Sequence, residues 1–370
     1  MTTMTDTAPL PFSQAHVLGA GLMGRLLAWA LLQRGCSVAL YDAQGPGAEG
    51  AAAHVAAAML APLAESAIAP ATVVRMGQHG LTRWPELLAT LPVPVFFQRE
   101  GTLVVWHRQD AAAATQFARQ LERTVREVPT LPGARALTGA DIAALEPTLG
   151  TRFPAGLLLP GEGQTHNRGV LDALLQALQA HPQAQLHWHT PVALEDFHPA
   201  THERVIDCRG LGAQADWPAP RGLRGVRGEV LRVHAPEVGI TRPVRLMHPR
   251  YPLYIAPKPE GHYVIGATEI ESADLSPASV RSALELLSAA YAVHSGFAEA
   301  RITEIGTQCR PALPDNLPAV RSLRPGIWQV NGLYRHGFLI APAMLDITLQ
   351  LLATGHSSLA EQTGLVLAPP

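Results

Sequence analysis

The sequence predicts an α/β protein in which a Rossmann-like nucleotide-binding domain is interwoven with a second domain built on a mostly antiparallel sheet. The segment that begins at Ala15, AHVLGAGLMGRLLAWALLQRGCSVALYD, has the order strand, glycine turn, helix, strand. From 225 to 274 the pattern changes to longer strands with period-two stretches, which is typical of an antiparallel sheet. A strand, glycine turn and helix return in 326–354, so we expect the nucleotide-binding domain to be discontinuous.

The first turn contains Gly19, Gly21 and Gly24 in the spacing G-x-G-x-x-G, which lets a backbone approach a pyrophosphate. Asp42 ends the second strand, 21 residues after Gly21, where an acid commonly binds a ribose hydroxyl. Because NAD and FAD both contain ADP-ribose and a pyrophosphate, these residues predict a dinucleotide and leave the choice between the two open.

The elements between these units follow from periodicity and turn residues. Residues 73–91 have a helical pattern, and 95–107 predict two paired strands around a turn at Glu100–Gly101. Helices are expected at 109–128 and 138–146, followed by a strand, a loop and a helix within 155–180. Two further strands are expected before residue 212. A helix is expected after residue 276, capped by Ser276 and with Pro277 at its first position.

This order divides the chain into two predicted domains. The nucleotide-binding domain takes 13–85, 150–222 and 303–370. The substrate-binding domain takes 86–149 and 223–302.

Composition excludes several classes of protein. The 370 residues are 47% hydrophobic and 16% charged, and the net charge of −2 gives no reason to expect nucleic acid or an anionic membrane as a partner. Three scattered cysteines without a C-x-x-C motif fit a reducing compartment. The N-terminus lacks a secretory pattern, and the alanine-rich run 51–74 is broken by His54, Pro62, Glu65 and Pro70, so we expect no membrane span and a cytoplasmic protein.

Sequence motifs leave few candidates for chemistry. The 16 histidines include no H-E-x-x-H or comparable spacing, so no metal site is expected. There is no G-x-S-x-G elbow and no Walker lysine. What remains is a set of arginines and aromatic residues in apolar loops, where an arginine either binds a carboxylate or forms a surface ion pair: Tyr254, Arg310, Tyr334, Arg335 and His336.

Seven segments spread over residues 15–353 together resemble the D-amino-acid-oxidase superfamily of flavoproteins, and within it the glycine oxidases of thiamine biosynthesis. They are GAGLMG, AAAMLAP, DCRGLGA, RGVRGEVLRV, PLYIAPKPEGHYVIGATE, CRPALPDNLPAV and NGLYRHGFLIAP, in the order of the family. The resemblance implies FAD rather than NAD, and a two-domain fold with the flavin ring at the interface.

The resemblance also implies roles for individual residues. Arg310 matches the carboxylate anchor, and Tyr254 matches the tyrosine that closes the same end of the pocket. Arg335 matches an arginine near flavin and substrate, and Met59 matches a methionine on the reacting face of the flavin. The cofactor contacts that it implies are Gly19, Ala20, Gly21, Met23, Gly24, Asp42, Ala58, Met59, Val192, Gly210, Gly332, Tyr334, Arg335, His336, Gly337 and Phe338.

The chain departs from the family at three places. Asp42 stands where glutamate is usual, and it keeps the ability to accept hydrogen bonds. Ala58 replaces a glycine, which adds a methyl group beside the flavin. The motif GLYRHG stands where GHFRNG is usual, so the contacts that the usual His and Asn make near the cofactor are replaced.

The function implied is FAD-dependent oxidative deamination of glycine or a similarly small amine, with O2 reduced to H2O2. The expected partners are the amino-acid substrate and O2, and the family often forms homo-oligomers. One alternative is a dehydrogenase of D-amino acids or secondary amines that passes electrons to another acceptor. The other is a nucleotide-binding protein without catalysis.

Overall fold

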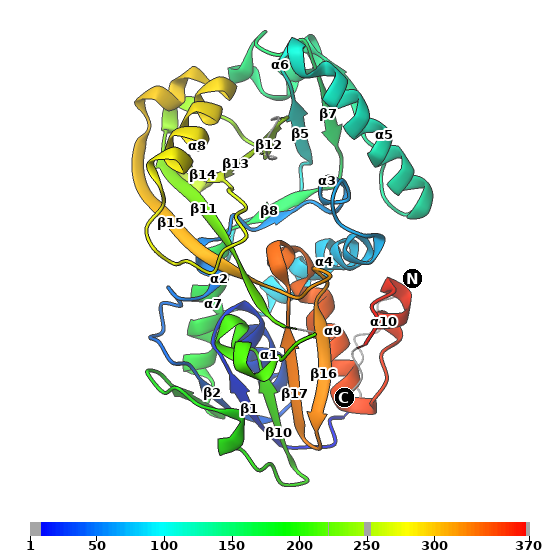
Figure 1. Ribbon diagram of the computed structural model, residues 1–370, viewed down its shortest axis with the longest axis vertical. Helices are drawn as coiled ribbons and strands as arrows, with labels where there is room; N and C mark the ends of the chain where they lie inside the picture. Colours follow the sequence, from blue (N-terminus) through cyan, green and yellow to red (C-terminus); the bar gives the residue numbers. More distant parts are fainter. Residues whose placement is uncertain (1–8, 221, 248–252, 368–370) are drawn as a thin grey trace.

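The computed structural model describes residues 9–220, 222–247 and 253–367. A mostly parallel sheet occupies the lower half of Figure 1 and a mostly antiparallel sheet the upper half, with short helices and strands between them. Residues 1–8, which include most of the N-terminal stretch discussed above, and residues 248–252 of the predicted strand region lie outside the described residues.

The parallel sheet carries the strand–turn–helix–strand unit. Strand β1 is parallel to β2 on one side and to β10 on the other, and β16 is the antiparallel edge strand. Its spatial order is β16 (Ala319–Arg324), β17 (Ile327–Asn331), β10 (Glu203–Asp207), β1 (Gln14–Leu18), β2 (Ser37–Tyr41) and β9 (Ala184–His187).

The antiparallel sheet confirms the change of pattern in the middle of the chain. Strands β11, β14, β13 and β12 pair successively in antiparallel fashion, and the long β15 lies along β11. The spatial order is β15 (Arg301–Ala312), β11 (Arg224–His234), β14 (His262–Gly266), β13 (Leu253–Lys258), β12 (Val244–Leu246), β5 (Thr102–Val105), β7 (Ala155–Leu159) and β6 (Arg135–Thr138). The two sheets confirm the predicted fold class.

Helices cover both sheets, and a third small sheet lies between them (Figure 1). That sheet consists of β3 (Met59–Leu60), β8 (Gly163–Thr165) and β4 (Phe97–Gln98). The helices are α1 (Leu22–Leu32), α2 (Ala52–Val55), α3 (Pro62–Glu65), α4 (Ala71–Ala89), α5 (Ala111–Glu127), α6 (Gly139–Leu145), α7 (Asn167–Ala180), α8 (Val280–Val293), α9 (Gly337–Thr354) and α10 (Ser358–Thr363).

Helix α9 is long, apolar and mostly buried. Together with the turn before it, residues 334–354 are long and apolar enough to cross a membrane by length and composition. The helix packs against α1 and α4, and most of it is buried inside the protein, as expected for a core helix.

Two local predictions were wrong. Strands β4 and β5 do not pair with each other, because β4 joins β8 while β5 lies between β7 and β12, where all four of its residues are buried. Helix α8 begins at Val280, and its N-cap is Ser279, whose hydroxyl accepts from Ser282 N. Ser276 donates instead to the carboxylate of Asp274.

The predicted domain bounds stay a prediction. Strands β7 and β15 belong to the antiparallel sheet, although those bounds assign all of β7 and nearly all of β15 to the nucleotide-binding domain. The packing between the sheets is nevertheless well defined, because Val55 and Ala57 form a buried cluster with Val230, Ala256 and Val264 of the antiparallel sheet. The 54–59 segment therefore joins the two halves.

Candidate active site

A cavity of about 580 Å³ extends between the two sheets from the first glycine turn to Arg310 and Tyr254. Of the residues predicted for the site, Ala20, Gly24 and Gly332 do not line it. The others do: Gly19, Gly21, Met23, Asp42, Ala58, Met59, Val192, Gly210, Tyr254, Arg310, Tyr334, Arg335, His336, Gly337 and Phe338.

The glycine turn has the close backbone approach that its spacing predicts. A Cβ on Gly24 would lie 1.8 Å from Gly19 O, and a Cβ on Gly19 would lie 2.7 Å from Cys208 O. Gly21 caps α1 without a side-chain hydrogen bond, so the first N–H groups of the helix remain available to an anion. This end of the cavity fits a pyrophosphate.

Asp42 connects the end of β2 to this turn. Its Oδ2 accepts from Ala20 N at 2.6 Å, and its Oδ1 accepts from Gln44 N at 2.8 Å. Carboxylate oxygens accept more than one hydrogen bond each, so the side chain can bind the backbone and a ribose hydroxyl together. The shorter acid thus also holds the glycine turn in place.

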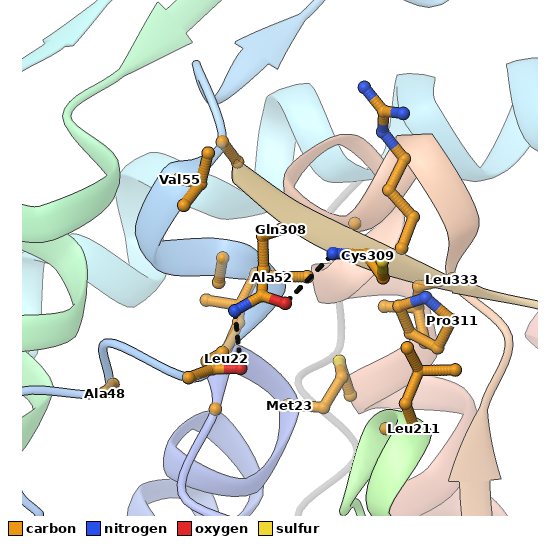
Figure 2. A pocket seen from close by; sticks show the side chains of 18 of the residues that line it. Leu22, Met23, Ala48, Ala52, Val55, Leu211, Gln308, Cys309, Pro311 and Leu333 are labelled. Atoms are coloured by element: carbon orange, nitrogen blue, oxygen red, sulfur yellow. Dashed lines mark hydrogen bonds between the residues drawn. The ribbon is translucent and has the colours of Figure 1, made fainter. Parts of the chain in front are cut away.

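The middle of the cavity has apolar walls (Figure 2). Gln308 of β15 points across it toward Leu22 and Ala52, donates to Gly50 O at 3.0 Å and accepts from Cys309 N at 2.9 Å. The apolar residues labelled around it are Met23, Val55, Leu211, Pro311 and Leu333. A flat aromatic ring system fits between such walls, whereas the turn at the far end fits the phosphates.

A buried lysine holds the segment before Met59. Lys258 donates to Ala57 O at 2.9 Å, to Thr165 O at 2.8 Å and to Gln164 Oε1 at 2.9 Å. Burial lowers the pKa of this ammonium. The next residue, Ala58, has a φ of 54°, in the left-handed region where glycine is favoured. The glycine usual in the family is therefore explained by the backbone, and this chain tolerates alanine there.

Arg310 is half-buried and has no carboxylate partner among the described residues. Its guanidinium donates to Arg227 O at 3.2 Å and to Thr268 O at 3.1 Å. Burial lowers its pKa, but an arginine remains charged at any working pH. Tyr254 lines the same end of the cavity, and burial raises the pKa of its hydroxyl. This end can hold a carboxylate.

Arg335 lies in the same cavity but is already paired. Its Nε is 3.2 Å from Glu65 Oε2, and its Nη1 is 2.5 Å from Glu269 Oε2. Tyr334 donates to Glu269 Oε1 at 2.6 Å. In the altered GLYRHG motif, Tyr334 and Arg335 thus both bind Glu269. Arg335 lines the cavity, but its charge is neutralised by glutamates.

Glu65 and Arg245 also line the cavity, and sequence reasoning missed both. Glu65 was taken only as a break in the alanine-rich run, although a single carboxylate in an apolar run was the available signal. Its Oε1 is 2.5 Å from Nη2 of Arg245. Burial alone would raise the pKa of Glu65, but Arg335, Arg245 and His336 hold it well below the ordinary value. Glu65 is therefore ionised.

Within the described residues, no three His, Cys, Asp or Glu side chains form a group that could hold a metal ion. The donors are instead those of a dinucleotide cleft whose far end has a cation, Arg310, without a carboxylate partner among the described residues.

The fold and site define a two-sheet, dinucleotide-dependent enzyme. The model of the FAD dependent oxidoreductase (DAO) family matches residues 15–351. A protein of Rhizobium etli named as a thiamine biosynthesis oxidoreductase, ThiO, is 40% identical over 338 residues, which cover 91% of this chain and 96% of that protein. The glycine oxidase of Pseudomonas aeruginosa is 26% identical and covers 91% of this chain and 94% of its own.

A crystal structure of glycine oxidase from Bacillus cereus has the same fold, with a TM-score of 0.80 and 19% identity over 95% of this chain and 98% of that one. The chain belongs to the FAD dependent oxidoreductase family. It is an enzyme, its cofactor is FAD, and the choice between NAD and FAD that the glycine turn left open is resolved.

Proposed function

We propose that this enzyme oxidises glycine or a similarly small amino acid to its imine, with O2 as the electron acceptor. Hydrolysis of the imine gives an oxoacid and ammonia, and the name of the Rhizobium etli relative supports a place in thiamine biosynthesis. The observation that carries the proposal is Arg310, a half-buried cation in the cavity that has only backbone carbonyl partners among the described residues.

Arg310 would bind the substrate carboxylate through two parallel hydrogen bonds, and the Tyr254 hydroxyl would donate a third. Fixing the carboxylate fixes the direction of the Cα–H bond, which is where most of the rate gain arises. Bound FAD would supply the hydride acceptor and a route for the electrons to O2, which would give H2O2. The protein contributes binding, orientation and exclusion of water.

The walls at this end favour a small substrate. Met59 and Tyr254 pack against a buried apolar cluster, and Arg335 is held in place by its two glutamates. A bulky side chain on the substrate would have to displace groups that are already packed or paired. Glycine and other small amines therefore fit best.

Two ligands that differ only in the carboxylate test the proposal. We expect glycine to bleach the flavin of the purified holoenzyme without oxygen, and ethanolamine at equal concentration to do so at least about 100-fold more slowly. The variants R310K and R310M should lose this preference while FAD stays bound. Equal rates for the two amines, or unchanged glycine kinetics in R310M, would contradict the assignment.

The electron acceptor is tested separately. On re-admission of air, an oxidase yields about one H2O2 for each substrate oxidised. Slow reaction with air together with fast reduction of an artificial dye would instead identify the dehydrogenase alternative.

A further inference from the structure

Helix α3 forms part of a wall between the substrate cavity, which Glu65 lines, and a second cavity of about 340 Å³, which Pro62 and Leu63 line. Glu65 and Arg245 face the substrate cavity, and Glu162 lines the second one. The Oε1 atom of Glu162 accepts from Ala64 N at 2.7 Å, so its carboxyl group binds the backbone directly before Glu65. The wall is thus made of three charged or titratable side chains.

Unsatisfied polar atoms concentrate in this wall. Among the described residues, eight buried side-chain nitrogen or oxygen atoms lack a hydrogen-bond partner, and five of them lie here or at its edge, although Glu65 Oε2 does form an ion pair with Arg335 Nε at 3.2 Å. Native proteins rarely leave such atoms unpaired, and internal water usually satisfies them. The five atoms are Glu65 Oε2, His336 Nδ1, Arg245 Nε, Glu162 Oε2 and Thr102 Oγ1.

These atoms offer internal water both donors and acceptors. Glu65 Oε2 lies 3.4 Å from His336 Nδ1, on the substrate side. Arg245 Nε can only donate, the carboxylate oxygens accept, and the Thr102 hydroxyl can do both. A water molecule needs two to four polar partners, so this set can hold a short chain of water through the wall.

One group in the wall can change its charge near neutral pH. Arg245 stays charged, and its attraction helps to keep Glu65 ionised. Burial raises the pKa of Glu162 to about 7, although Arg245 and the Thr102 hydroxyl oppose this and Glu65 adds to it.

The cationic and titratable side chains that line the second cavity beside Glu162 bind to other residues. Arg99 donates to Gly161 O at 2.9 Å, and His79 lies 2.7 Å from the Asp346 carboxylate. Both line the second cavity with Glu162. Neither hydrogen-bonds to the Glu162 carboxyl group, and its Oε2 atom has no hydrogen-bond partner among the described residues.

We propose that Glu65, Arg245 and Glu162 form a hydrated proton passage between the two cavities, and that Glu162 takes up the proton that an ammonium substrate loses. The inference rests on the proposed function, because it needs an amine substrate. The N–H bond of R–NH3⁺ breaks, its electron pair stays on nitrogen, and an O–H bond forms on the Glu162 carboxylate through intervening water. Glu162 then releases the proton to water in the second cavity.

The test compares the wild-type holoenzyme with E162Q and E162D by the rate of anaerobic flavin bleaching with glycine from about pH 6 to 10. We expect the wild-type rate to rise through about pH 7. In E162Q the rate near pH 7.5 should fall roughly 10- to 100-fold and approach the wild-type rate only where glycine itself is neutral. E162D keeps a carboxyl group and should restore the rise in the bleaching rate near neutral pH.

A binding control separates this role from a structural one. Acetate has no ammonium group, and its binding is followed by the flavin spectrum at about pH 6, where Glu162 is mostly protonated. E162Q should bind acetate within about twofold of wild type. If E162Q loses both acetate binding and the bleaching rate, Glu162 has a structural role and the proton passage is overturned.

The remaining outcomes are also decisive. If E162Q fails to retain FAD, T102V carries the test, because it removes a water partner without changing charge and should slow bleaching several-fold near pH 7.5 but not at about pH 10. An unchanged pH profile in a wild-type-like E162Q overturns the passage alone. Failure of every small amino acid to bleach the wild-type flavin overturns the proposed function, and the passage with it.

Discussion

A Cβ on Gly228 would lie 2.4 Å from Cζ of Arg310, so the guanidinium occupies the space that any larger residue would fill. Gly228 lies in β11 and Arg310 in β15, and the two strands pair along most of their length. Tyr254 is packed against a glycine in the same way, since a Cβ on Gly266 would lie 2.6 Å from the Tyr254 hydroxyl. Both proposed substrate-binding side chains therefore depend on a glycine in the neighbouring strand.

Replacing Gly228 by alanine should displace the Arg310 guanidinium. We expect KM for glycine to rise roughly 10- to 100-fold, which corresponds to about 1.4–2.8 kcal/mol, with FAD still bound. Steady-state kinetics and acetate titration measure the effect. G133A is the control, because a Cβ on Gly133 has no neighbour within 4 Å. Unchanged KM in G228A would contradict the role given to this pair.

The left-handed conformation of Ala58 predicts that replacement by glycine has opposite effects on stability at Ala58 and at its neighbour Ala57. A58G should be neutral or stabilise the protein by up to about 1 kcal/mol, because glycine has no steric penalty at a φ of 54°. A57G should destabilise it by about 0.5–1 kcal/mol or more, since Ala57 is buried and has no positive φ. Urea unfolding of the holoenzyme measures both, and a loss in A58G as large as in A57G would refute the explanation.

Removing the charge of Glu65 should be costly. In E65Q the cations Arg245 and Arg335 lose their shared carboxylate in a buried site, and we expect a loss of about 3 kcal/mol in the free energy of unfolding. The control E361Q breaks the exposed pair with His356 and should change stability by less than ~0.5 kcal/mol. Comparable effects of the two variants would show that the buried cluster adds no special stability.

Acid sensitivity should depend on His166. Burial, with Lys258, Arg232 and Arg168 nearby, lowers its pKa from 6.5 to about 4. A depressed pKa in the folded state gives stability that is fully present above pH 6.5 and is lost as the pH falls toward 4.

The matched variant for this prediction is H166N. Asparagine can still accept from Gly169 N at the start of α7, as His166 Nδ1 does, but it does not titrate. Thermal unfolding from about pH 7.5 to 4.5 should show a smaller fall of Tm in H166N than in wild type. Parallel curves would mean that His166 does not cause the acid sensitivity.

Features encoded by neighbouring residues could be predicted from the sequence. The spacing of Gly19, Gly21 and Gly24 predicted a turn that the structure contains, because steric limits on a tight turn depend on only a few consecutive residues. Hydrophobic periodicity likewise separated the parallel part from the antiparallel part. The hairpin predicted around Gly101 failed because pairing partners are chosen by burial, and β5 is buried between β7 and β12.

The sequence by itself thus determined the two kinds of sheet and the dinucleotide turn, and its resemblance to a family indicated FAD. The tertiary structure alone decided that Glu65 lies between Arg245 and Arg335, and that Glu162 is buried behind them. It also decided that Arg310 has no carboxylate partner among the described residues while Arg335 has two. The physical reason is that the charge state and availability of a side chain depend on burial and on partners far away in the chain, which no local pattern encodes.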